Sequence, residues 1–131
     1  MAICKRITAT LFTALTAGLF LVSEAFALSP QEETRVENLL TAVRKQEQLI
    51  FIRNGSEHNA ADAESHLRLK LSKTKKRLST AEQFVDKVAS GSSISGKPYQ
   101  VKLPGKDPVD AKVYLTELLA ETDKAAAAKP E

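Results

Sequence analysis

The chain contains few of the residues that cross-link small domains. Among its 131 residues there is one cysteine, Cys4, and there is no tryptophan. A single thiol excludes an intramolecular disulfide and a zinc site made of several cysteines. Glycine and proline occur five times each, which excludes collagen-like and low-complexity chains. A fold built from this sequence must therefore be held together by the packing of aliphatic side chains.

A strong excess of one charge is also absent. The chain has 19 basic and 16 acidic residues, a formal net charge of +3. So small an excess, spread over a whole domain, does not indicate an electrostatic partner such as DNA or RNA. We therefore predict no nucleic-acid partner.

The one long apolar run lies near the amino terminus. It spans Ile7–Val22, 16 residues with four threonines, and it follows Lys5 and Arg6. A membrane-spanning helix needs about 20 mostly apolar residues. Ala25–Ala27, a small-x-small cleavage pattern, comes directly after the run, as in a secretory signal peptide. We expect residues 1–27 to be removed, which predicts an exported protein without a stable membrane anchor.

Cleavage would also remove the only thiol. Cys4 precedes the apolar run and is not at the cleavage point, so a lipoprotein anchor is not predicted. Lys5, Arg6 and Glu24 leave with the signal peptide, which reduces 19 basic and 16 acidic residues to 17 and 15. The remaining chain is predicted to be one cysteine-free domain, residues 28–121, followed by a disordered tail, residues 122–131.

Helix-capping signals divide this domain into four helices. Each signal is followed by apolar residues at helical spacing, and polar residues fill the positions between them. The predicted helices run from Ser29-Pro30 to about Gln48, from Asn59 to about Leu78, from Thr80 to a stop at Gly91, and from Asp107-Pro108 to residue 121.

Strand signals lie between the helices. Leu49–Ile52 is a β-branched and aromatic run, and Asn54-Gly55 after it is typical of a tight hairpin turn. Ser56–His58 would be the return strand. Tyr99–Leu103 alternates apolar and polar residues and is the best candidate for a third strand. The sequence therefore predicts an α+β fold, with about four helices packed on a two- to three-stranded antiparallel sheet.

The loop Gly91–Lys97 has the spacing G-x-x-x-x-G-K of a phosphate-binding loop. A nucleotide-binding loop follows a strand and continues into a helix. Here a helix precedes the loop, and Pro98 and a strand follow it, so nucleotide binding is not predicted. The serines could hold another anion through backbone N–H groups, although an ordinary polar connection is the commoner use of such a loop.

Other candidate sites are incomplete. Asp62 and His66 are one helical turn apart, but a zinc site needs three or four ligands; a half-buried, hydrogen-bonded imidazole is the favoured interpretation of His66. A run of cations follows at the end of the same helix. The helix dipole stabilises positive charge at this position, and the cations could also contact anionic lipid head groups. This run consists of Lys73, Lys75, Lys76 and Arg77.

Several short motifs together resemble the YfeK-like family, small exported proteobacterial proteins with a domain of unknown function. The resemblance covers most of residues 30–120 and implies a periplasmic location, without an activity, cofactor or partner. Family members often carry an aromatic residue where this chain has His58, which argues against a metal role there. The motifs are Phe51–Gly55, His66-Leu67 with Lys70-Leu71, Thr80–Phe84, Ala89-Ser90 with Ser92-Ser93, Ser95-Gly96 and Pro98-Tyr99.

No complete catalytic constellation is present, so we predict a non-enzymatic binding or interaction module of the cell envelope, with no cofactor. Its partner would be an envelope protein or a small anionic ligand. The alternatives are a small periplasmic hydrolase that uses a loop serine with His66 or Lys97, and a weak metal or anion binder. The predicted contact surface is Arg53, Asn54, Ser92, Ser93, Ser95, Lys97 and Tyr99.

Overall fold

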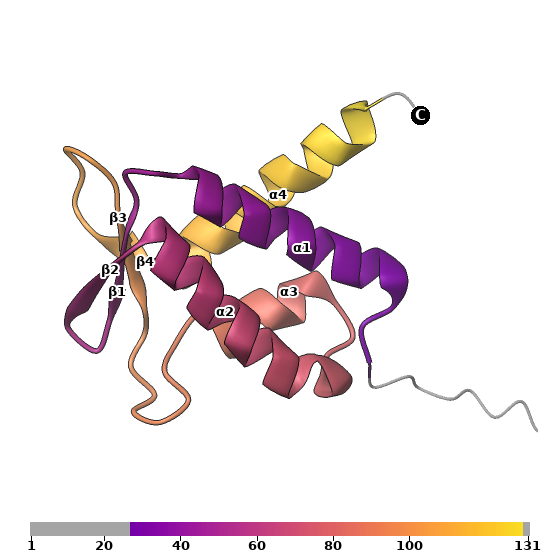
Figure 1. Ribbon diagram of the computed structural model, residues 1–131, viewed down its shortest axis with the longest axis horizontal. Helices are drawn as coiled ribbons and strands as arrows, with labels where there is room; N and C mark the ends of the chain where they lie inside the picture. Colours follow the sequence, from indigo (N-terminus) through magenta and orange to yellow (C-terminus); the bar gives the residue numbers. More distant parts are fainter. Residues whose placement is uncertain (1–26, 130–131) are drawn as a thin grey trace, which may run out of the picture.

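The computed structural model describes residues 27–129. The predicted signal peptide therefore lies, apart from Ala27, outside the described residues, as do the last two residues of the predicted tail. Within the described part, helices and a small sheet form an α+β fold (Figure 1), as predicted. The elements are α1 (Pro30–Lys45), β1 (Ile50–Arg53), β2 (Ser56–Asn59), α2 (Ala60–Thr74), the 3₁₀ turn η1 (Lys75–Arg77), α3 (Ala81–Phe84), the π-helical turn η2 (Val85–Ala89), β3 (Gln100–Lys102), β4 (Val109–Asp110) and α4 (Ala111–Ala128).

Three helices begin at the predicted caps. In each case the capping side chain accepts a hydrogen bond from a backbone N–H of the first turn, which would otherwise lack a partner. The caps are Ser29 Oγ with the N–H of Glu32 at 3.3 Å, Asn59 Oδ1 with that of Asp62 at 2.8 Å, and Thr80 Oγ1 with that of Gln83 at 3.1 Å.

The carboxyl ends of the first two helices differ from the predictions. α1 stops at Lys45, not near Gln48, because the chain turns there: the N–H of Leu49 donates to the carbonyl of Gln46 at 2.9 Å. This turn buries Leu49, which is 1% exposed, beside the first strand. α2 ends at Thr74 and tightens into η1 before the predicted end at Leu78.

The sheet is antiparallel with the order β2-β1-β3-β4. Asn54 and Gly55 form the predicted hairpin turn, and both have left-handed backbones with φ of 49° and 80°. Such angles match the twist of the two strands and suit asparagine and glycine. β3 lies within the predicted Tyr99–Leu103 strand and pairs with β1.

The fourth strand was not predicted. Asp107-Pro108 was expected to begin the last helix, but Val109 pairs with Val101 and Asp110 with Gln100. The N–H of Ala111 then donates to the carbonyl of Tyr99 at 2.8 Å, and the helix starts at that residue. The backbone N–H and C=O groups of this segment find their hydrogen-bond partners in β3. Helix signals in the local sequence give no information about such a distant partner. The sheet thus has four strands, not two to three.

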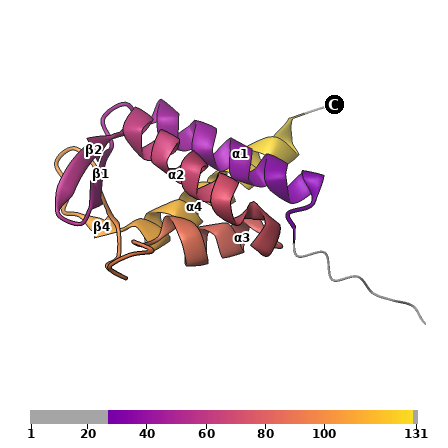
Figure 2. The ribbon, with the colours of Figure 1, turned by 60° about the horizontal axis from the view of Figure 1, so that its bottom comes forward.

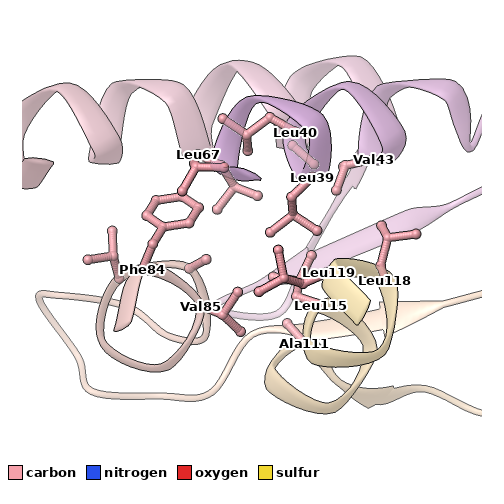
Figure 3. Close-up of a cluster of buried hydrophobic side chains, with 14 of the residues drawn as sticks. Leu39, Leu40, Val43, Leu67, Phe84, Val85, Ala111, Leu115, Leu118 and Leu119 are labelled. Atoms are coloured by element: carbon pink, nitrogen blue, oxygen red, sulfur yellow. The ribbon is translucent and has the colours of Figure 1, made fainter. Parts of the chain in front are cut away.

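The helices and one face of the sheet enclose the core. Both ribbon views place the sheet at one end of the helices (Figures 1 and 2), and α1 contacts both α2 and α4. Phe51 and Val101, at most 1% exposed, contribute the buried face of the sheet. Figure 3 shows side chains from four helical segments converging on one space. They include Leu39, Leu40 and Val43 of α1, Leu67 of α2, Phe84 and Val85 at the junction of α3 and η2, and Leu115, Leu118 and Leu119 of α4.

α4 continues to Ala128. The disordered tail was predicted to begin at residue 122, so most of that segment is helical. Alanine has the highest helix propensity of all residues, which favours helix at Ala125–Ala128. Asp123 also accepts hydrogen bonds from the Arg35 guanidinium, at 3.1 Å to Nε and 2.8 Å to Nη2, which ties this part of α4 to α1. Among residues 27–129 there is no helix with the length and apolarity required to cross a membrane.

Candidate functional site

The main candidate site is a pocket of about 450 Å³ beside the outer face of α2. Its size is within the range of small-molecule sites. Five segments contribute to it, which brings the end of β1 next to the Ser-rich loop. The lining residues are Arg53, Asn54, His66, Leu69, Lys70, Lys73, Thr74, Arg77, Ser92, Ser93, Ile94 and Tyr99.

The loop from Gly91 to Pro98 is folded back on itself. Its two ends form an antiparallel bridge, and the N–H of Ser92 donates to the carbonyl of Lys97 at 3.0 Å. Ser92 is 9% exposed, and its Oγ accepts from the N–H groups of Ile94 and Ser95 at 3.3 and 3.2 Å. These bonds within the loop preorganise the wall that it gives to the pocket.

Glycine at the start of this loop allows a close backbone approach. A Cβ on Gly91 would lie 3.2 Å from the carbonyl oxygen of Lys97, tighter than most Cβ contacts. A larger residue would therefore need the backbone at Lys97 to shift by a few tenths of an ångström.

Two side chains fasten the loop to the rest of the domain. Ser95 Oγ donates to Asn54 Oδ1 at 2.8 Å, which joins the loop to the hairpin turn. Lys70 Nζ donates to the carbonyl of Gly91 at 2.6 Å and to Tyr99 Oη at 3.2 Å. The same ammonium lies 4.7 Å from the centre of the Tyr99 ring. α2, the loop and the start of β3 are therefore held by one cation.

Tyr99 is the most buried member of the lining, with 3% of its surface exposed. Its ring meets Phe51 edge to face at 5.4 Å between centres, and its hydroxyl lies 3.3 Å from His66 Nε2. Burial, followed by the charges of Arg53 and Lys70, lowers the pKa of His66 to about 4. His66 is thus the half-buried, hydrogen-bonded imidazole that the sequence favoured, and it is neutral at pH 7.

The pocket is cationic. Arg53, Lys70, Lys73 and Arg77 line it, and none of the lining residues is an aspartate or glutamate. Arg53 Nε is buried and has no hydrogen-bond partner within the described residues, while its Nη2 lies 3.4 Å from His58 Nε2. Four positive charges with no carboxylate among the lining residues form an electrostatic site for an anion.

The structure brings most of the predicted contact residues together. Five of the seven line the pocket: Arg53, Asn54, Ser92, Ser93 and Tyr99. Ser95 holds the loop through Asn54. Lys97 is exposed outside the lining, and its backbone carbonyl closes the loop.

The face that α2 and η1 present to the pocket was recognised only in part, since His66 and the basic run from Lys73 to Arg77 were considered separately and not as one wall with the Ser-rich loop. This face carries a recurring three- and four-residue spacing, the signal that could have revealed it. Only part of the basic run belongs to it, since Lys73 and Arg77 line the pocket, whereas Lys75 lies 3.9 Å from Glu33. The residues on this face are His66, Leu69, Lys70, Lys73, Thr74 and Arg77.

The geometry also bears on the other candidates. The N–H groups of Ile94 and Ser95 bond to Ser92 Oγ, so a ligand would meet side-chain cations in place of a cradle of backbone amides. His66 bonds to Tyr99 and, within residues 27–129, to no serine of the loop. The described residues contain no cluster of three or more carboxylate, imidazole or thiol groups of the kind that binds a metal ion.

These features define a class of protein: a small α+β domain with a preorganised cationic pocket between a helix and a Ser-rich loop. Comparison with known proteins identifies its family. Residues 30–123 match the model of DUF5329, a family of unknown function, and the chain belongs to this family.

A relative supports this assignment. The protein described as "Uncharacterized protein YfeK" of Salmonella typhimurium (strain LT2) is 53% identical over 83 residues, which cover 63% of this chain and 69% of the relative. The resemblance to the YfeK-like family is therefore confirmed. No solved structure matches the chain.

Proposed function

We propose that this protein is a non-enzymatic binding protein of the cell envelope that holds a small anionic ligand in the cationic pocket. The observation that carries this proposal is the lining itself. Four cations surround about 450 Å³ of space, and no lining residue is acidic. Like charges that face one another repel, and an anion between them removes that repulsion.

Arg53 lines the pocket with a guanidinium whose donors are not all paired. Its Nε has no hydrogen-bond partner among the described residues. The planar guanidinium presents paired N–H groups that match carboxylate and phosphate oxygens. A phosphate or carboxylate in the pocket would therefore meet in Arg53 a donor group that suits its oxygens.

The pocket is also preformed, because its walls are joined before a ligand arrives. Lys70 links α2 to Gly91 and Tyr99, and Ser95 links the loop to Asn54. Little further ordering is needed on binding, and affinity rises when that cost has already been met during folding.

Lys73 and Arg77 differ from Lys70, since within the described residues neither side chain forms a hydrogen bond or an ion pair, whereas Lys70 donates to Gly91 and Tyr99. Their charges are thus available to the ligand. They are one helical turn apart on the same face of α2 and η1, so both can approach one anion.

Location in the periplasm is part of the proposal; it rests on the signal pattern of residues 1–27, which predicts export, and on the periplasmic location that the resemblance to the YfeK-like family implies. Cleavage after Ala27 would leave the core complete, because Leu28 is the first described residue that is buried, at 6% exposure. The N–H of Leu28 donates to the carbonyl of Lys75 at 3.3 Å, a bond that an amino terminus at this position could also donate. Mass spectrometry of the protein from cells checks this: a species that retains Met1 contradicts export by cleavage.

Calorimetric titration with pyrophosphate, a compact polyanion, tests the pocket. We expect saturable binding that weakens with salt, and a loss of about tenfold or more for Arg53→Met or Lys73→Met, since each removes one charged contact. Lys106→Met is the matched control, because Lys106 is exposed outside the pocket lining. Failure to bind, or equal losses in all three variants, overturns the proposal.

A further inference from the structure

The pocket carries an apolar rim that a free anion would not use. Two of its lining residues, Leu69 and Ile94, are 52% and 99% exposed. The other exposed large hydrophobic side chains of the described residues are Val109 and Val113, and neither lines this pocket. Half of the exposed large hydrophobic residues therefore gather beside its cations.

Ile94 is exposed on a rigid support. Its own N–H donates to Ser92 Oγ, and the N–H of Gly96 donates to the carbonyl of Ser92 at 3.0 Å. The Gly91–Pro98 bridge closes the loop behind it. The isoleucine is thus held at the top of a short turn and cannot collapse onto the domain without breaking these bonds.

The cations and the apolar residues belong to one face. Leu69, Lys73 and Arg77 follow each other at four-residue spacing along α2 and η1, and Lys70 is the neighbour of Leu69 on that face. Lys97 adds a further exposed cation to the loop that carries Ile94. Basic and apolar side chains arranged this way are typical of surfaces that lie at the boundary between lipid head groups and acyl chains.

From this arrangement we infer that the natural occupant of the pocket is the anionic head group of a membrane phospholipid, and that the protein binds peripherally to an anionic bilayer. The inference rests on the proposed function and names its ligand. The lipid phosphate lies among Arg53, Lys73 and Arg77, while Ile94 and Leu69 enter the bilayer surface. A phospholipid suits both halves of the site because its phosphate and its apolar chains belong to the same molecule.

Vesicle sedimentation with the protein purified from cells, in whichever processed form it accumulates there, tests the inference. Vesicles of phosphatidylglycerol with phosphatidylethanolamine are compared with vesicles of phosphatidylcholine alone. We expect binding to the anionic vesicles, weakened by salt, and little binding to the neutral ones. Ile94→Ser should lower vesicle affinity about tenfold more than it lowers pyrophosphate affinity, because it removes most of the apolar contact.

Val113→Ser is the matched control, since Val113 is 53% exposed and lies outside the pocket. An equal loss of vesicle binding in Val113→Ser and Ile94→Ser overturns the inference. Pyrophosphate binding without vesicle binding also overturns it, yet leaves the proposed anion site intact. Failure of both ligands rejects the site as a whole.

Because the chain has no tryptophan, a single introduced tryptophan can report how deeply its position enters the bilayer. Ile94→Trp and Val113→Trp each place one fluorophore in the chain. On vesicles that contain brominated acyl chains, Ile94→Trp should be quenched and shifted to the blue, whereas Val113→Trp should keep the emission it has in buffer. Equal quenching of the two variants contradicts insertion of the loop.

Discussion

Replacement of Lys70 by methionine separates the structural use of a cation from its use in binding. The methionine keeps an unbranched apolar stem but removes the bonds from Nζ to Gly91 and Tyr99 and the contact with the Tyr99 ring. Hydrogen bonds from a charged group are worth about 1.5–3 kcal/mol each, and a cation above an aromatic ring about 0.5–2 kcal/mol.

The net loss is smaller than the sum of these values. Lys70 is only half-buried, so its ammonium regains water when the protein unfolds. Tyr99 also keeps a partner in His66, at 3.3 Å. We therefore expect a loss of about 2 kcal/mol in the free energy of unfolding, or roughly 8–16 °C in Tm for a domain of this size.

Thermal unfolding followed by circular dichroism at neutral pH measures this loss. Lys73→Met is the comparison, because Lys73 lines the same pocket but, among the described residues, its side chain forms no hydrogen bond of the kind that Lys70 makes. Its stability should change by less than about 0.5 kcal/mol, although both variants weaken anion binding. Equal Tm values for the two variants would refute the view that Lys70 fastens the loop. A double-mutant cycle with Tyr99→Phe should also give a coupling of about 0.5–1 kcal/mol.

Three other perturbations probe the rest of the fold. His66 has a pKa of about 4 in the folded protein against an ordinary 6.5, so the unfolded chain binds more protons between these values and stability falls as the pH drops through that window. After allowance for solvent screening, the loss is about 1–2 kcal/mol, and urea unfolding at neutral and acidic pH should show a shallower dependence for His66→Gln. Arg35 binds carboxylates of α1, α3 and α4; Arg35→Met should cost about 2–3 kcal/mol in urea unfolding at low salt and less at high salt, and equal losses would contradict an electrostatic cause. Gly55 has φ of +80°; Gly55→Ala should cost about 1 kcal/mol in the same assay, whereas no loss would show that the turn relaxes.

Much of the fold was predictable because its signals are local. The caps at Ser29, Asn59 and Thr80 are single side chains that bond to N–H groups three residues ahead. The Asn54-Gly55 turn needs only the left-handed backbone that these two residues tolerate. Such preferences act within a few residues of chain and can be read without knowledge of the rest.

The candidate site was predictable only in part. The Ser-rich loop and the end of β1 were recognised through motifs, and the pairing of two predicted strands brings them together. The role of α2 as a wall of the pocket was not recognised, because cations such as Lys73 and Arg77 are common at the carboxyl end of any helix. Their participation depends on where the loop packs. Lys70 fixes that position through its hydrogen bond to Gly91, 21 residues away in the chain.

The sequence by itself determined where three of the four helices start, where the hairpin turns and which side chains face a core, since backbone preference and apolar spacing are properties of short segments. Only the tertiary structure decided that Val109 and Asp110 form a strand, that α4 is tied to α1 through Arg35 and Asp123, and that four cations share one pocket. Each of these depends on partners distant along the chain, whose positions follow from the packing of the whole domain.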